Sequence, residues 1–109
     1  MLVPLPTGIF SDYDLTTRAV IGALYNRLRL SSYNLTGGDE TWYDDQEGRA
    51  YCVYTHDELA RMIGVGERTI RRSLALLQAD GLVWWRKATY KGANRYYVHD
   101  YIMQELRGQ

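Results

Sequence analysis

Cysteine, proline and long apolar runs are all scarce in this sequence of 109 residues. Its single cysteine, Cys52, cannot form an intramolecular disulfide, and too few Cys and His residues accompany it for a zinc finger. No apolar run approaches the roughly 20 residues that span a bilayer. The first ten residues lack the basic segment of a signal peptide. The sequence therefore predicts a cytoplasmic protein that is not bound to a membrane.

A net charge is also absent, because 13 Lys and Arg residues balance 13 Asp and Glu residues. The charges are nevertheless unevenly distributed. The segment from His56 to His99 has eight basic and four acidic residues and carries +4, so the remainder carries −4. A basic segment of this kind is typical of a surface that binds nucleic acid. Hydrophobic residues make up 46% of the chain, which is enough for the core of one domain over residues 1–109.

The first part of the chain is predicted to contain an extended arm and one helix. Two prolines disfavour helix within residues 1–10, which we expect to be the arm. From Leu15 to Leu28, apolar residues recur at spacings near 3.6 and predict a helix over residues 16–30. Three arginines fall off this apolar stripe and are expected to be solvated: Arg18, Arg27 and Arg29.

A polar segment is expected after this helix. Residues 31–49 are rich in Ser, Asn, Asp and Gly, a composition typical of a loop. Asp44, Asp45 and Glu47 lie in this segment without the regular spacing of a calcium-binding loop, so we expect a solvated acidic loop and no metal. Residues 50–54 are β-prone and predict the first strand.

Residues 55–80 predict a helix-turn-helix. Thr55 and Glu58 have the spacing of a capping box, which begins a helix that we expect to end at Gly64. A helix-turn-helix needs a small residue where its helices cross, a permissive residue at the turn and an apolar residue on the inner face of the second helix. The residues that meet these requirements are Ala60, Gly64 and Ile70.

The second helix of this motif is expected to begin at residue 66 or 67 and to end at residue 80. Its apolar edge consists of Ile70, Leu74 and Leu77. In helix-turn-helix proteins the N-terminal part of the second helix enters the major groove. The candidate contacts there are Glu67, Arg68, Thr69, Arg71 and Arg72. Arginines suit guanine edges or phosphates, and Glu67 either accepts from a cytosine or favours the helix dipole. The alternative is an ordinary helical hairpin with a solvated arginine face.

Residues 82–99 predict a β-hairpin, the wing of a winged helix-turn-helix. Two β-prone runs flank a polar turn around Gly92. Candidates for contacts with phosphates or the minor groove are Lys87, Lys91, Asn94 and Arg95. The aromatic residues Trp84, Trp85, Tyr96 and Tyr97 alternate across the hairpin, so we expect some to pack against the helices and others to lie outside. A basic hairpin that only favours solubility is the alternative. A short helix over residues 100–107 follows.

No catalytic residue, cofactor or metal is predicted. The sequence has no glycine-rich phosphate-binding loop. Cys52, His56 and His99 do not form a recognisable arrangement of nucleophile and base, and Cys52 is expected to be a small buried residue. We therefore expect a protein that binds double-stranded DNA and is not an enzyme.

From Phe10 to Val98 the order of features resembles the N-terminal domain of RepA-type plasmid replication initiators. The similarity lies in the first helix and in the polar segment after it. The matching residues are Ala23-Leu24-Tyr25, Arg29-Leu30-Ser31, Asn34, Trp42, Asp44 or Asp45, Gly48, Arg49, Tyr51 and Thr55. The sequence departs from the family pattern at residues 35–41, which look like an insertion between Asn34 and Trp42.

The resemblance implies a dimeric, sequence-specific protein that binds direct repeats (iterons) at a plasmid origin, with the arm and first helix as the dimer contact. By their matching positions, four residues would lie in the major groove and two on the wing: Arg68, Thr69, Arg71 and Arg72, then Lys91 and Arg95. It also implies a second domain, absent from this chain, that contacts host replication proteins. A winged-helix transcription repressor, a phage DNA-binding protein or a winged helix that contacts only proteins would use the same scaffold.

Overall fold

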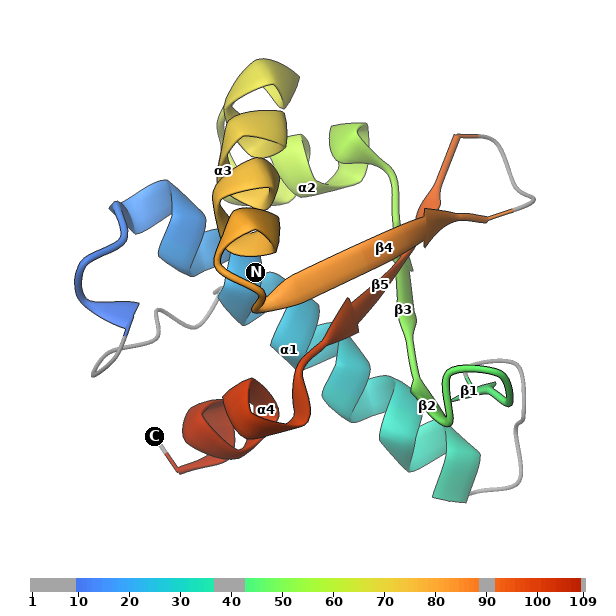
Figure 1. Cartoon of the computed structure of the whole chain (residues 1–109). Coiled ribbons are helices and arrows are strands. Elements are labelled where there is room, and N and C mark those ends of the chain that lie inside the picture. Colours follow the sequence, from blue (N-terminus) through green and yellow to red (C-terminus); the bar gives the residue numbers. More distant parts are fainter. Residues whose placement is uncertain (1–9, 37–42, 89–91, 109) are drawn as a thin grey trace.

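The computed structural model describes residues 10–36, 43–88 and 92–108. The helices and strands of this part of the chain are α1 (Leu15–Thr36), β1 (Tyr43–Asp44), β2 (Arg49–Ala50), β3 (Cys52–Tyr54), α2 (His56–Ile63), α3 (Glu67–Ala79), β4 (Val83–Lys87), β5 (Asn94–Val98) and α4 (Asp100–Arg107) (Figure 1). Four helices and small antiparallel sheets confirm the predicted α+β class. No helix in the described ranges is long and apolar enough to cross a membrane.

Helix α1 lies at the centre of the structure, between the helix-turn-helix and α4 (Figure 1). Its buried residues Val20, Ile21 and Leu24 contribute to one core with residues of α3 and the sheet. A buried hydrogen bond from Thr17 Oγ1 to Ser73 Oγ, 2.9 Å long, joins α1 to α3. The core therefore fixes how α3 sits on α1.

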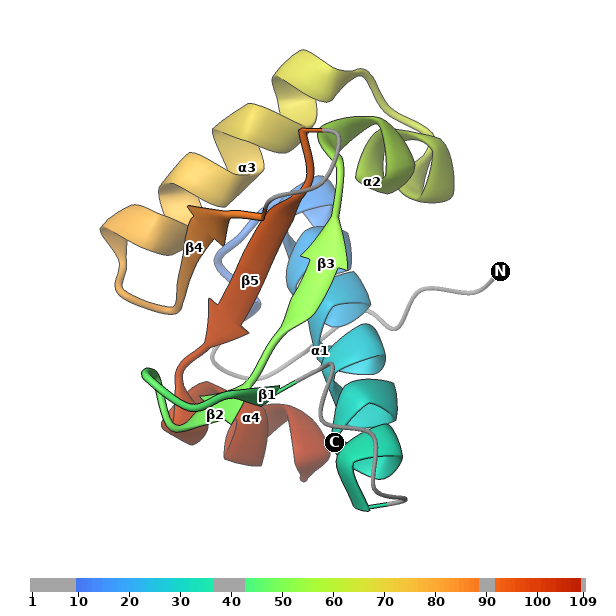
Figure 2. The same cartoon turned by 90° about the vertical axis from the view of Figure 1, so that its right-hand side faces the viewer.

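The main sheet has the strand order β3-β5-β4, and both pairings are antiparallel (Figure 2). Tyr96 of the central strand pairs with Cys52 on one side and with Trp85 on the other. These three side chains belong to the core that includes the helices or pack against it. Because successive side chains of a strand point to opposite faces, Tyr97 and Trp84 lie on the other face.

The first helix is longer than the sequence predicts. It was expected over residues 16–30 but continues to Thr36, so residues 31–36 are helical and the predicted loop is wrong there. Once a helix has formed, each added residue gains a backbone hydrogen bond, and no Gly or Pro interrupts residues 23–36. Leu15 is 65% exposed and not part of the apolar face. It precedes Leu24 by nine residues, which places it about half a turn away around the helix.

Arg27 and Phe10 have environments that the sequence did not predict. Arg27 is not simply solvated, because its Nη1 donates to the carbonyl of Val53 at 2.8 Å and its guanidinium lies 3.8 Å from the Tyr54 ring. It links α1 to β3. Of the predicted arm, only Phe10 belongs to the described residues, and it is fully buried in the core.

The outer face of the main sheet is covered by the acidic hairpin, which we define as residues 43–50 (β1, β2 and their turn). On this face Trp84 and Tyr97 stack with their ring centroids 5.6 Å apart. Asp44 Oδ2 accepts a 2.6 Å hydrogen bond from the Tyr97 hydroxyl, and Glu47 Oε2 accepts one from Trp84 Nε1 at 3.2 Å. The hydroxyl of the buried Tyr97 and the Nε1–H of the partly buried Trp84 therefore both have acceptors.

The expectation of a solvated acidic loop is therefore wrong for two of its three carboxylates. The side chains of Asp44 and Glu47 are only 10% and 17% exposed, whereas Asp45 is exposed. Of the hairpin aromatics, Tyr96 and Trp85 pack with the helices as expected. Tyr97, on the other face, is not outside as expected but fully buried, because the acidic hairpin covers it.

Replacement of Leu74 by Ala should lower the free energy of unfolding by about 2–5 kcal/mol, because the substitution leaves a cavity beneath α3. Leu74 is fully buried, whereas Leu76 of the same helix is exposed. Leu76→Ala is the matched control and should cost less than about 1 kcal/mol. Urea denaturation followed by circular dichroism measures both values. Equal losses for the two variants would contradict the orientation of α3.

Replacement of Asp44 by Asn should reduce the acid sensitivity of the fold. The hydrogen bond from Tyr97 lowers the pKa of Asp44 from its ordinary value of 3.8. A carboxyl with a lowered pKa in the folded state adds stability above its ordinary pKa and loses it as the pH falls through the folded value. The free energies of unfolding of wild type and variant should differ near neutral pH and converge as the pH falls through the lowered pKa of Asp44. Urea denaturation at a series of pH values measures the difference. Asp45→Asn should have the same dependence of the free energy of unfolding on pH as the wild type. If Asp44→Asn lowered the free energy of unfolding by the same amount at every pH, the link between the ionisation of Asp44 and stability would be refuted.

Candidate nucleic-acid interface

The turn between α2 and α3 has the local structure that the sequence predicts. Thr55 Oγ1 accepts from the backbone NH of Glu58 at 3.0 Å, and Thr55 NH donates to Glu58 Oε1 at 2.9 Å, which completes the capping box. Gly64 ends α2 with φ +86°, a left-handed conformation that favours glycine. Its NH donates to the carbonyl of Ala60 at 2.8 Å. Ala60 is buried where the helices approach.

Helix α3 has one buried and one exposed face. Ile70, Leu74 and Leu77 are buried, as predicted. The exposed residues on the other side are Glu67, Arg68, Arg71, Arg72 and Ala75. Thr69 is partly buried at the margin. The structure thus brings together the predicted residues of α3 on one surface.

Two arginines of α3 form loose ion pairs with acids of the same chain. Arg71 Nη2 lies 3.7 Å from Glu67 Oε1, one helical turn earlier, and Arg72 Nη2 lies 3.5 Å from Asp14 Oδ2. Among the residues that the structure describes, Arg68 has no ion-pair partner. Sequence reasoning missed Asp14, because a contact across 58 positions leaves no local pattern.

The residues predicted on the wing have different environments. Lys87 is exposed at the end of β4. Arg95 is half-exposed, 3.8 Å from Asp44 Oδ2 and 4.8 Å from the centre of the Tyr51 ring. Lys91 lies outside the described residues.

Asn94 does not lie at the exposed tip as expected. It is 9% exposed, and its Nδ2 donates to the Tyr96 hydroxyl at 3.2 Å. Asn94 and Tyr96 are two positions apart on β5, so both side chains point to the helix-facing side of the sheet. Its amide is therefore occupied inside the domain.

Arg86 is a surface cation that was not among the predicted contacts. It is more than half exposed, and its Nη2 lies 2.5 Å from Glu47 Oε1. Its place beside Lys87 in a basic run was the available sequence signal. We use "the basic surface" for five exposed residues: Arg68, Arg71 and Arg72 of α3, with Lys87 and Arg86 of β4. By strand alternation, Arg86 belongs to the sheet face of Trp84, which points away from the helices.

The first turn of α3 and the turn-side ends of β4 and β5 lie toward the same end of the molecule in both views (Figures 1 and 2). Helix α4 and the acidic hairpin lie toward the opposite end. An exposed helix N-terminus accompanied by a hairpin is the arrangement with which winged helix-turn-helix proteins approach a duplex.

Cys52 and His56, two of the residues considered as nucleophile and base, have shifted pKa values. Burial raises the pKa of the Cys52 thiol to about 12, so it remains protonated and unreactive. Burial and the charge of Arg71 lower the pKa of His56, which favours its neutral form. The described part of the chain has no group of three His, Cys, Asp or Glu side chains that could hold a metal ion.

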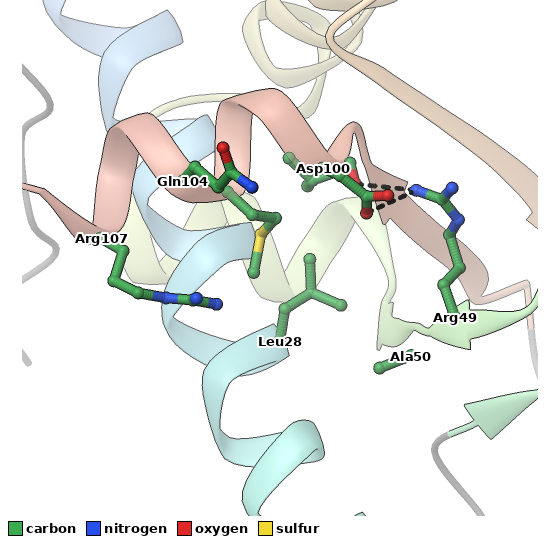
Figure 3. Close-up of a pocket in the computed structure, with 8 residues that line it drawn as sticks. Leu28, Arg49, Ala50, Asp100, Gln104 and Arg107 are labelled. Carbon is green, nitrogen blue, oxygen red and sulfur yellow. Dashed lines mark hydrogen bonds and ion pairs between the residues drawn. The ribbon is translucent and has the colours of Figure 1, made fainter.

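A separate cavity of about 270 Å³ lies between α1, β2 and α4 (Figure 3). Leu28 and Met103 contribute apolar atoms to its wall. At its edge Arg49 Nη1 and Asp100 Oδ1 form an ion pair of 3.1 Å. None of the residues of the basic surface lines this cavity.

Comparison with solved structures finds the same fold. One is described as the N-terminal domain of a DNA-binding protein, with a TM-score of 0.64 and 19% identity over 92% of this chain and 75% of that chain. Another is the structure of a Rep–DNA complex, with a TM-score of 0.64, 20% identity and the same coverage. The structure of the MDR initiator has a TM-score of 0.63 and 22% identity over 92% and 77% of the two chains. The winged-helix fold is thereby confirmed.

The comparison with curated proteins gave no match. The family model of the N-terminus of replication initiator protein A (RepA), by contrast, matches residues 7–107. This range includes the polar segment, the helix-turn-helix and the wing, on which the resemblance in sequence depends. The chain therefore belongs to the family of replication initiator protein A (RepA) N-terminal domains.

Proposed function

We propose that this chain binds double-stranded DNA in a sequence-specific manner, as the DNA-binding part of a plasmid replication initiator. The observation that carries the proposal is the exposed row of Arg68, Arg71 and Arg72 on α3, opposite the face that the core buries. A helix with its apolar side fixed in the core presents these guanidinium groups in a constant direction. Their planar donors match guanine O6 and N7 or phosphate oxygens.

The two parts of the basic surface have different roles in this proposal. Helix α3 enters the major groove, where Arg71 and Arg72 contact base edges. On the wing, Lys87 contacts the adjacent phosphates and Arg86 contacts a base edge in the minor groove. Glu67 stands in the first turn of α3 and pairs with Arg71. These contacts favour the helix-dipole role of Glu67 over recognition of a cytosine.

Membership of the initiator family and the fold shared with a Rep–DNA complex support this assignment. We further infer that the DNA target consists of repeats at an origin and that the chain acts as a dimer. Contact with host replication proteins would belong to a second domain. The role is binding and not catalysis, which the unreactive environment of Cys52 supports.

Arg71→Ala and Arg72→Ala should each weaken binding to a cognate duplex by about 1–3 kcal/mol, because each removes a bidentate contact to a base. Lys87→Ala should weaken binding to all sequences alike, because a phosphate contact carries no sequence information. The duplex is obtained by selection from a random library, and affinities are measured by fluorescence anisotropy.

Arg107→Ala is the matched control for these variants, because Arg107 is exposed on α4 at the other end of the molecule. It should retain wild-type affinity. Unchanged binding by all three variants of the basic surface would show that DNA does not contact this face.

Footprinting should reveal protection of an array of tandem repeats, with adjacent repeats protected at similar protein concentrations. An initiator requires such arrays, whereas a repressor on the same scaffold binds isolated palindromes. The measurement compares a tandem array with a single palindromic site of the selected sequence, with a scrambled array as control. Protection of the palindrome alone would favour the repressor.

A further inference from the structure

Two arginines of the basic surface are paired with carboxylates that belong neither to the helix-turn-helix nor to the wing. Arg72 Nη2 lies 3.5 Å from Asp14 Oδ2, and Arg86 Nη2 lies 2.5 Å from Glu47 Oε1. Asp14 directly precedes α1, and Glu47 lies in the turn between β1 and β2. Two separate parts of the chain thus each place a negative charge beside a cation that we assign to DNA binding.

Other contacts hold both carboxylates in place. Asp14 Oδ1 accepts from the backbone NH of Thr17 at 2.7 Å, and this hydrogen bond is the main cause of the lowered pKa of Asp14. The Asp14 side chain therefore remains ionised at neutral pH. Glu47 Oε2 accepts from Trp84 Nε1 at 3.2 Å, and the Glu47 side chain is only 17% exposed. When either arginine turns toward DNA, the carboxylate beside it therefore keeps its position.

The paired arginines remain accessible to DNA. The side chains of Arg72 and Arg86 are 64% and 56% exposed. The Arg72–Asp14 pair is exposed on both sides and therefore weak, so a phosphate or a base can replace its carboxylate. In the Arg86–Glu47 pair only the arginine is exposed, so DNA has to compete with a carboxylate that keeps its hydrogen bond from Trp84. The fixed acid nevertheless repels a nearby phosphate and offsets part of the charge of its arginine. The two pairs should therefore reduce the number of phosphates that the surface neutralises.

This reduction affects cognate and random DNA differently. Binding to random duplex depends on phosphate neutralisation and on the release of counterions. Binding to a cognate site has additional hydrogen bonds to base edges, which a displaced ion pair does not remove. Displacement of the ion pair costs the same in both complexes. In the random complex, however, the arginine meets a charged phosphate that the fixed carboxylate repels, whereas at the cognate site it meets an uncharged base edge. The fixed acid therefore lowers affinity for random DNA by a larger factor than affinity for the cognate site.

We propose that Asp14 and Glu47 are specificity-determining residues, which compete with DNA phosphates for Arg72 and Arg86 and thereby suppress binding to non-cognate duplex. The inference rests on the proposed function, because it assumes that the basic surface contacts DNA. It extends that function by assigning a role in recognition to acids outside the recognition helix.

The test removes each negative charge and keeps the local hydrogen bond. Asp14→Asn retains a residue that caps a helix as well as Asp does. Glu47→Gln retains an oxygen that can accept from Trp84. Asp100→Asn is the matched control, because it removes the same charge from the 3.1 Å pair with Arg49 beside the distant cavity (Figure 3).

Affinities for a short random-sequence duplex and for the selected site are measured by anisotropy between about 50 and 200 mM salt. Asp14→Asn and Glu47→Gln should each bind the random duplex several-fold more tightly at low salt. Each should also steepen the log–log salt dependence by about 0.9, the contribution of one additional neutralised phosphate. The ratio of specific to random affinity should fall, whereas the control should preserve both the slope and the ratio.

The outcomes separate this inference from the proposed function. Wild-type slopes and ratios in both variants would overturn the inference and leave DNA binding intact. An equal change in Asp100→Asn would also overturn it, because the effect would then follow net charge alone. Absence of binding by the wild type and all variants would overturn both proposals. Thermal melting measures whether each variant is folded. If one variant melts at a much lower temperature than the wild type, the result for the other variant decides between these outcomes.

Discussion

The orientation of the basic surface depends on the burial of one face of α3 against α1. Ile70, Leu74 and Leu77 are almost completely removed from solvent, and rotation of the helix by one residue, about 100°, would turn Arg71, Ala75 and Gln78 inward in their place. Burial of an unpaired arginine costs far more than exposure of a leucine gains, so the helix has one stable rotation. The hydrogen bond from Thr17 to Ser73 adds a polar contact at a defined position along the same interface.

The wing requires a second constraint, because its sheet has aromatic side chains on both faces. The helices cover Tyr96, whereas the acidic hairpin covers Tyr97 and part of Trp84. Removal of the Tyr97 hydroxyl and the Trp84 Nε1–H from water requires acceptors, and Asp44 and Glu47 supply them. Carboxylates in such a place need positive neighbours in turn, and Arg95 and Arg86 provide that charge. Cations of the wing thus stabilise the fold that positions them.

The helix-turn-helix could be predicted from the sequence because its signals are local. A capping box, a left-handed glycine and an apolar period of 3.6 residues each involve neighbours within four positions. Those signals fixed the bounds of α2 and α3 and the exposed positions of Arg68, Arg71 and Arg72, all of which the structure reproduces.

The features that were predicted wrongly depend on the place of a residue in the helix, strand or core and not on the composition around it. A polar composition suggested a loop over residues 31–49, yet part of it continues α1 and part of it covers the wing. Asn94 looked like a tip residue because its neighbours are polar, although its place in the strand register directs it toward Tyr96. Asp14 and Arg72 are 58 positions apart, and no periodicity connects them. Such pairings arise only once the core has brought α1 and α3 together.

These contacts show where some of the acids that balance the net charge lie. A net charge of zero would be unfavourable for a DNA-binding domain if the charges were mixed evenly, because long-range attraction to the duplex would vanish.

In this chain the described cations of the basic surface fall into two kinds. Arg68 and Lys87 have no ion-pair partner among the described residues, whereas Arg71, Arg72 and Arg86 each lie beside an acid. Unpaired cations attract any duplex, while paired ones gain most where a base edge adds hydrogen bonds to the charge. Discrimination then follows from where the acids lie and not from the number of arginines.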